Sequence, residues 1–139
     1  MRHLEDLEVG QSAETLRTVS AADIDGFAAV SGDHNPVHVD DAFAATTSFG
    51  GRIAHGMLAA AFISAAVGNE LPGPGAVYIT QSLKFRRPVK PGDTVATRVE
   101  ITAIDARRGW VTLKTACSVG GKTVVDGEAV VAFPKRGAA

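Results

Sequence analysis

The chain has 139 residues, of which 45% are hydrophobic and 21% charged, and its 14 basic and 15 acidic side chains give a formal charge of −1. This length fits one domain with a core of its own, and the composition excludes a mainly disordered chain. The near-zero charge argues against nucleic acid as the main partner, because domains that bind phosphate backbones are usually strongly basic.

The first half of the chain has the pattern of a strand followed by short helices. Alternation over Ser12–Val19 predicts a strand. Ser20 and Asp23 have the spacing of a capping box, and the apolar residues behind them fall on one face of a helix over residues 21–30. Gly32 is expected to end this helix.

A loop is expected next, followed by a second short helix. Pro36 lacks an N–H and pushes the residue before it out of the helical region, so residues 32–40 are predicted to form a loop. Asp40 or Asp41 then caps a short helix that carries Phe43.

A long apolar helix is predicted over residues 53–67, where apolar residues occur on nearly every side. It is shorter than the about 20 residues that a membrane-spanning helix needs, so we expect it to be buried inside a protein. After Gly75 the period changes from 3.6 to 2, which predicts four antiparallel strands: Ala76–Phe85, Thr94–Ile104, Trp110–Val119 and Thr123–Phe133.

Helices followed by strands indicate an α+β fold rather than a parallel nucleotide-binding sheet. A curved antiparallel sheet around the apolar helix would bury the helix and cover the inner face of the sheet, which is the hot-dog arrangement. Its open sheet edges predict that two copies associate as a homodimer. We expect one domain over residues 1–134 and a frayed tail over residues 135–139.

Two features of the sequence bear on location and metal binding. Residues 1–8 mix charges and have no apolar segment, so no signal peptide is expected. Cys117 has no second cysteine to pair with, which favours a reducing, cytoplasmic setting and a packing role for this residue. The four histidines lack cysteines at zinc-ligand spacing, and no metal is expected.

Acidic residues and histidines concentrate in the predicted loop. Asp33 and His38 lie five residues apart around the stiffening proline, which suits a pair that moves protons. Asp40 and Asp41 are interpreted as helix caps, and His34 as a solvated side chain.

The start of the apolar helix is the second candidate site. Its first N–H groups have no partner within the helix, and Gly56 would let an anionic oxygen approach closely, although the glycine could serve tight packing alone. His55 is interpreted as a structural cap rather than a base, and Ser64 could bond back to its own helix. A basic cluster follows, which is either a solvated face or a contact for phosphates: Lys84, Arg86, Arg87 and Lys90.

These segments resemble the MaoC-like hydratase family, and in particular its short members with a single hot-dog domain. The resemblance runs through nearly the whole chain. It is carried by Gly32–Asp40, Phe43-Ala44, Ala54–Leu58, Gln81–Phe85 and Gly127–Val131. The combination of the Gly-Asp-x-Asn-Pro-x-His loop with a downstream His-Gly-Met is the specific part.

The resemblance implies roles for several residues. Asp33 and His38 match the catalytic pair, and the Gly56 N–H matches the donor to an oxyanion. Asn35 and Ser64 match residues that support the active site, and Val67 and Val130 match residues that line an acyl pocket. His34 fills a variable position of the motif and is given no role.

The activity implied is (R)-specific enoyl-CoA hydration, the reversible syn addition of water to a trans-2-enoyl-CoA to give an (R)-3-hydroxyacyl-CoA. The implied partner is an acyl-CoA thioester, the implied assembly a homodimer, and no cofactor is needed beyond the coenzyme A of the substrate. One alternative is a 3-hydroxyacyl-ACP dehydratase of fatty-acid synthesis. Another is a non-catalytic acyl-CoA-binding hot-dog protein. A thioesterase is disfavoured, because the Asp–His loop precedes the long helix as it does in hydratases.

Overall fold

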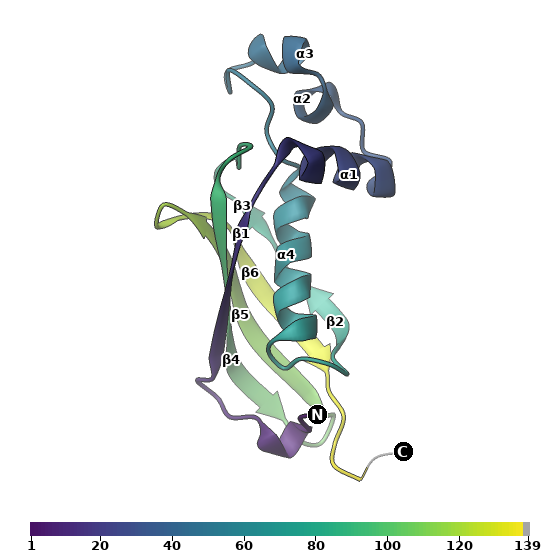
Figure 1. Cartoon of the computed structure of the whole chain (residues 1–139). Helices are drawn as coiled ribbons and strands as arrows, with labels where there is room; N and C mark the ends of the chain where they lie inside the picture. The colour runs from purple at the N-terminus through teal and green to yellow at the C-terminus, as the bar shows by residue number, and fades with distance from the viewer. Residues whose placement is uncertain (138–139) are drawn as a thin grey trace.

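One antiparallel sheet and one long helix make up the body of the molecule (Figure 1). The computed structural model describes residues 1–137. The helical elements are a 3₁₀ turn at Leu4–Asp6 and the helices α1 (Ala21–Ser31), α2 (Pro36–Val39), α3 (Asp41–Ala45) and α4 (Gly56–Asn69). The strands are β1 (Ser12–Thr18), β2 (Val77–Gln81), β3 (Lys84–Phe85), β4 (Thr94–Asp105), β5 (Trp110–Val119) and β6 (Lys122–Ala132).

The sheet has the order β1-β4-β5-β6-β2, with β3 also paired to β6, and every pairing is antiparallel. Alternate residues of β4 and β5 are buried, as expected for strands with one face against a core. The helix α4 lies against this face (Figure 1) and buries Leu58, Ala59, Ile63, Ala66 and Val67. The predicted α+β, hot-dog fold is confirmed.

The opposite face of α4 is open. Met57 is 54% exposed, and Ala61, Ser64 and Ala65 are also exposed. The expected burial of this apolar helix therefore holds for one face, and the other face is exposed in the single chain.

The helix α4 begins at Gly56, later than the predicted start at Ile53. The three preceding residues lie outside the helix, and other segments use their backbone groups. The Ala54 N–H donates to the Val89 carbonyl at 2.7 Å, and the Ile53 carbonyl accepts from the His38 ring at 2.8 Å. These bonds tie the start of α4 to its surroundings.

The strand predicted over Ala76–Phe85 is broken into β2 and β3 at Ser82-Leu83. A Cβ at Gly127 on the neighbouring β6 would lie 1.8 Å from the Ser82 carbonyl oxygen. The two backbones therefore approach closely at the break, which a glycine permits and any other residue would prevent.

Capping of the first helices follows the prediction. Ser20 and Asp23 form the capping box of α1, and Gly32 ends this helix with φ of 77°. Asp40 accepts from the Phe43 N–H at 3.0 Å and caps α3. The predicted loop over residues 32–40 is partly wrong, because Pro36 opens the one-turn helix α2, where its missing N–H costs nothing.

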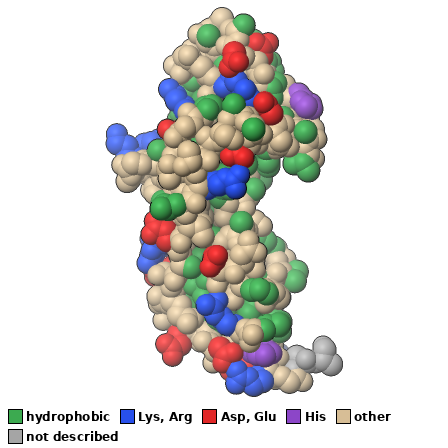
Figure 2. All heavy atoms as spheres, viewed as in Figure 1, with side chains coloured by type: hydrophobic (Ala, Val, Ile, Leu, Met, Phe, Trp, Pro, Cys, Tyr) green, Lys and Arg blue, Asp and Glu red, His purple; other side chains and the backbone are tan. Residues whose placement is uncertain are grey.

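The helices α1, α2 and α3 gather beyond the N-terminal end of α4 (Figure 1). The molecule is narrower where these three helices join the sheet body (Figure 2). At the other end, Arg136 forms an ion pair with Asp6, and the predicted tail residues 138–139 lie outside the described residues. Among residues 1–137, no helix is both long and apolar enough to cross a membrane.

Candidate active site

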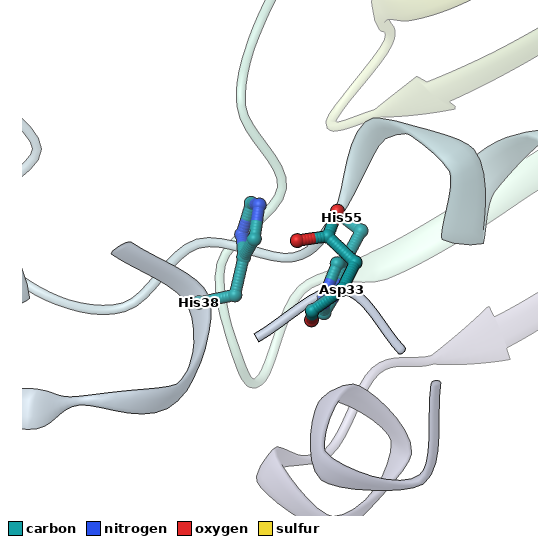
Figure 3. Close-up of side chains that lie close together, drawn as sticks. All are labelled: Asp33, His38 and His55. Atoms are coloured by element: carbon teal, nitrogen blue, oxygen red, sulfur yellow. The ribbon is translucent and has the colours of Figure 1, made fainter. Parts of the chain in front are cut away.

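Three titratable side chains meet at the N-terminal end of α4. Asp33, His38 and His55 each place a carboxylate oxygen or ring nitrogen within 4.8 Å of the others. They come from the loop after α1, from α2 and from the residue before α4, and the Asp33 carboxylate points toward the His38 ring (Figure 3). The structure thus brings together the two residues that the sequence selects as a proton-transfer pair.

Asp33 is held by its own loop. Its backbone N–H donates to the Ser31 hydroxyl at 3.1 Å, and its carboxylate accepts the Asn35 N–H at 3.1 Å. Asn35 in turn caps α2 through its side-chain oxygen, which accepts the Val37 N–H at 3.2 Å. Asn35 therefore connects the carboxylate of Asp33 to the helix that carries His38.

His38 is half-buried, and its ring is held in one tautomer. Its Nδ1 lies 2.8 Å from the Ile53 carbonyl oxygen. Since a carbonyl oxygen can only accept, Nδ1 carries the proton, and Nε2 of the neutral ring keeps its lone pair. His38 is therefore oriented as a base at Nε2.

Arg52 holds the backbone of His38, a contact that no pattern in the sequence predicts. Its Nε donates to the His38 carbonyl at 2.5 Å, and its guanidinium also pairs with Asp25 of α1. The Arg52 side chain is only 10% exposed. It therefore links α1 to α2 behind the site.

His55 is buried, with 2% of its surface exposed. It occupies the position before α4, but its side chain makes no capping hydrogen bond, so the predicted cap role is wrong. Its Nε2 instead lies 2.9 Å from the Asp33 carbonyl oxygen, and its ring stacks on His38 with centroids 3.9 Å apart. Its structural role is to contact the loop rather than the helix.

Gly56 is the first residue of α4, so its N–H has no partner within the helix. A Cβ at this position would lie 2.7 Å from two carbons of the Phe85 ring. The glycine is therefore required for packing, and its place as the first residue of α4 puts its N–H at the positive end of the helix. The two interpretations of Gly56 are compatible.

A cavity of about 520 Å³ opens beside these residues. Its walls are largely apolar and include Ile53, Met57 and Phe85, with Ala59 and Val125 toward the core. Its polar lining comes from His38, His55, Arg86 and Arg87. Asp33 does not line the cavity itself; its side chain is exposed and directs its carboxylate toward the His38 ring (Figure 3).

Besides Asp33 and Asn35, three predicted site residues do not line this cavity. Ser64 lies on the open face of α4, and Val67 is packed in the core with 2% exposure. Val130 alternates with Ala129 and Val131, which are buried, and so it lies on the opposite face of β6. The single chain therefore does not bring these three residues to the Asp33–His38 pair.

The basic cluster is divided by the fold. Arg86 and Arg87 line the cavity, where Arg86 pairs with Asp126 and Arg87 donates to the Thr123 carbonyl. Lys90 instead donates to the Phe49 carbonyl at 3.2 Å.

Cys117 is buried, and this burial raises the pKa of its thiol, which fits the predicted packing role.

Asp33, His38 and His55 are also the residues that could hold a metal ion. The two imidazole rings are stacked, with an angle of 26° between their planes. Imidazole lone pairs lie in the ring plane, so nearly parallel rings do not direct them at one ion. The arrangement favours proton transfer over metal binding.

A curved antiparallel sheet around α4, with an Asp–His pair ahead of that helix, defines a hot-dog enzyme of the hydratase type. A family model described as MaoC like domain matches residues 6–125. The chain belongs to this family, as the sequence motifs predict.

Its relatives are similar over nearly their full length. The chain is 51% identical to an (R)-specific enoyl-CoA hydratase of Rhodospirillum rubrum, covering 99% of this chain and 95% of the relative. It is 49% identical to a 3-hydroxybutyryl-CoA dehydratase of Methylorubrum extorquens, covering 96% and 85%. The structure of the R-hydratase PhaJ1 from Pseudomonas aeruginosa superposes with a TM-score of 0.91 at 48% identity, covering 96% of this chain and 86% of that one.

Proposed function

We propose that this protein is an (R)-specific enoyl-CoA hydratase that adds water reversibly to trans-2-enoyl-CoA. The observation that carries the proposal is the placement of the Asp33 carboxylate and the His38 ring together at the N-terminal end of α4. The names of the relatives identify the substrate class and the R product.

The reaction needs a base for water and an acid for the carbon next to the thioester. Asp33 and the Nε2 lone pair of His38 hold one water molecule and remove its proton as the oxygen attacks C3 of the enoyl group. The same pair then returns a proton to C2. Because one pair serves both carbons from one side, the addition is syn.

Negative charge develops on the thioester oxygen as an enolate when water attacks C3. The Gly56 N–H at the start of α4 is the donor that stabilises this oxygen, a contribution of about 3 kcal/mol for one such donor. The electrophilic C3 is already present in the substrate, so the proposed reaction uses no cofactor beyond coenzyme A.

The cavity supplies a place for the substrate. Its apolar walls suit an acyl chain, and Arg86 and Arg87 at its lining suit the phosphates of coenzyme A. The carrier is therefore proposed to be coenzyme A.

We further propose a homodimer in a reducing, cytoplasmic compartment. The edge strand β2 exposes Val77, Tyr78 and Ile79, and the open face of α4 exposes Met57. A second copy would cover these apolar side chains and bring new walls to the face that carries Ser64. The single buried thiol of Cys117 supports the compartment.

The test is a hydration assay with crotonyl-CoA and crotonyl-ACP, followed by chiral analysis of the product. The proposal expects rapid loss of the enoyl absorbance with the CoA substrate and formation of (R)-3-hydroxybutyryl-CoA. Preference for the ACP substrate would make the protein a dehydratase of fatty-acid synthesis. Release of free thiol, or binding without turnover, would contradict the proposal.

A further inference from the structure

One buried polar atom in the site has no partner. Among residues 1–137, the Nδ1 of His55 is the one buried side-chain nitrogen or oxygen without a hydrogen bond. Buried polar atoms are nearly always paired, so an orphan beside an active site needs a physical reason. The hydration mechanism above uses neither ring nitrogen of His55.

The other nitrogen of this ring explains the orphan. The His55 Nε2 lies 2.9 Å from the Asp33 carbonyl oxygen, which can only accept a hydrogen bond. The neutral ring therefore carries its proton on Nε2, and Nδ1 is left with a lone pair. His38 has the opposite tautomer, because its Nδ1 donates to the Ile53 carbonyl.

His55 contacts both members of the proposed catalytic pair. It donates to the backbone of Asp33, and its ring lies against the His38 ring at 3.9 Å between centroids. Phe27 of α1 packs on His55 as well, with ring centroids 4.9 Å apart. Asp33 and His38 come from separate elements, and this one side chain fixes both.

The backbone beside His55 belongs to the body of the molecule. On one side of His55, the Ala54 N–H donates to the Val89 carbonyl at 2.7 Å. On the other side, α4 begins at Gly56. Groups that contact His55 are therefore held relative to the start of α4, which also carries the Gly56 N–H. The orphan Nδ1 is buried and makes no hydrogen bond.

We propose that His55 is a positioning residue, which holds Asp33 and His38 at a fixed place relative to the N-terminus of α4. This inference rests on the proposed hydratase function. His55 acts mainly through its Nε2–H to the Asp33 carbonyl, with the ring face as a smaller contact, and transfers no proton. A displacement of about 1 Å in a catalytic group can cost about 100-fold in rate, so the effect belongs in kcat rather than KM.

Two substitutions separate the hydrogen bond from the ring. His55→Gln puts an amide N–H near the position of Nε2 but has no ring, whereas His55→Phe keeps a ring and loses the donor. We expect His55→Phe to lower kcat by about 10- to 100-fold with KM changed less than about threefold, and His55→Gln to recover kcat to within about fivefold of the wild type. Phe27→Leu, which alters packing on the other side of the ring, is the control and leaves kcat within about threefold.

Kinetic outcomes decide the role. Full activity in His55→Phe would mean that the ring only packs, and the proposal would be wrong. An equal loss in folded His55→Gln and His55→Phe would mean that the donor is not what matters, and would also overturn it. A wild-type protein without hydratase activity would instead remove the proposed function, and the kinetic test with it.

A spectroscopic measurement keeps the inference testable independently of activity. Long-range ¹H–¹⁵N correlation spectra of the wild-type protein report which ring nitrogen of each histidine is protonated. We expect His55 protonated on Nε2 and His38 protonated on Nδ1. A proton on Nδ1 of neutral His55 would exclude its hydrogen bond to Asp33 and overturn the proposal.

Discussion

The sheet with α4 and the α1–α3 segment are held by different interactions. Strands β4 and β5 bury Val95, Val99, Val111 and Leu113 completely, and their backbones form an antiparallel ladder interrupted only by an irregularity between Ile101 and Ala103. The segment over residues 21–45 buries Ile24, Ala28 and Ala44, and otherwise depends on caps and single hydrogen bonds. Apolar burial therefore stabilises the body, and local polar contacts shape the segment.

This difference separates stability from activity. The site lies where the two regions meet: Asp33 and His38 belong to the segment, and His55 and Gly56 to the start of the body's helix. Substitutions in the segment should reduce turnover with little change in unfolding, whereas substitutions in the body away from the start of α4 should do the reverse. The following predictions run from the largest expected effect on turnover to the smallest.

Replacing Asp33 by Asn should give the largest loss. The amide keeps an oxygen for the Asn35 N–H but cannot accept a proton, so kcat should fall about 1000-fold. Because Asp33 is exposed, Tm should change by less than about 2 °C. Steady-state kinetics and thermal unfolding test both parts. Near-normal turnover in a folded variant would exclude Asp33 from the chemistry.

Gly56→Ala should lower kcat by about 10- to 100-fold. The added methyl meets the Phe85 ring at 2.7 Å and displaces the start of α4, although the N–H itself is kept. The matched control is the double variant Gly56→Ala with Phe85→Leu, which makes room for the methyl and should recover part of the rate. A loss confined to KM would assign Gly56 to binding and packing alone.

Asn35→Ala should lower kcat by about 10-fold and destabilise the fold by about 1 kcal/mol. It removes the side-chain cap of α2 and loosens the backbone N–H that Asp33 accepts. Asn35→Ser retains a capping oxygen and is the control, for which we expect most of the rate to return. Kinetics and denaturant unfolding of the two variants would separate the effect of the Asn35 cap on turnover from its effect on stability. Identical rates in both variants would show that the cap does not contribute to turnover.

Ile63→Ala should have the smallest effect on turnover and a large effect on stability. Ile63 is completely buried on α4, so its truncation should cost about 2–5 kcal/mol in the free energy of unfolding. The kcat of the folded fraction should stay within about twofold of the wild type. A large drop in kcat without loss of stability would show that the body and the segment are not separable.

Much of the fold follows from local signals in the sequence. The Ser20–Asp23 capping box, the left-handed Gly32 and the change of period after Gly75 predict the element order and the hot-dog arrangement. Their spacing and the family motif predict that Asp33 and His38 come together, as they do beside the start of α4, whereas their catalytic role stays a prediction. These signals succeed because each depends on a few neighbouring residues.

The remaining features depend on contacts between distant segments. Nothing near Ser82 predicts the break between β2 and β3, which comes from its approach to Gly127. Arg52 carries no pattern that points to the His38 carbonyl, and His55 resembles a cap until its bond to Asp33 is visible. Proline at position 36 was expected to prevent helix, and it begins one instead.

The central claim is that one Asp–His pair delivers both the hydroxyl and the proton from one side. Hydration of crotonyl-CoA in D₂O, with NMR analysis of the product, tests it directly. We expect a single (R)-3-hydroxybutyryl-CoA diastereomer with the C2 deuteron syn to the new hydroxyl. An anti product, or a mixture at C2, would contradict it.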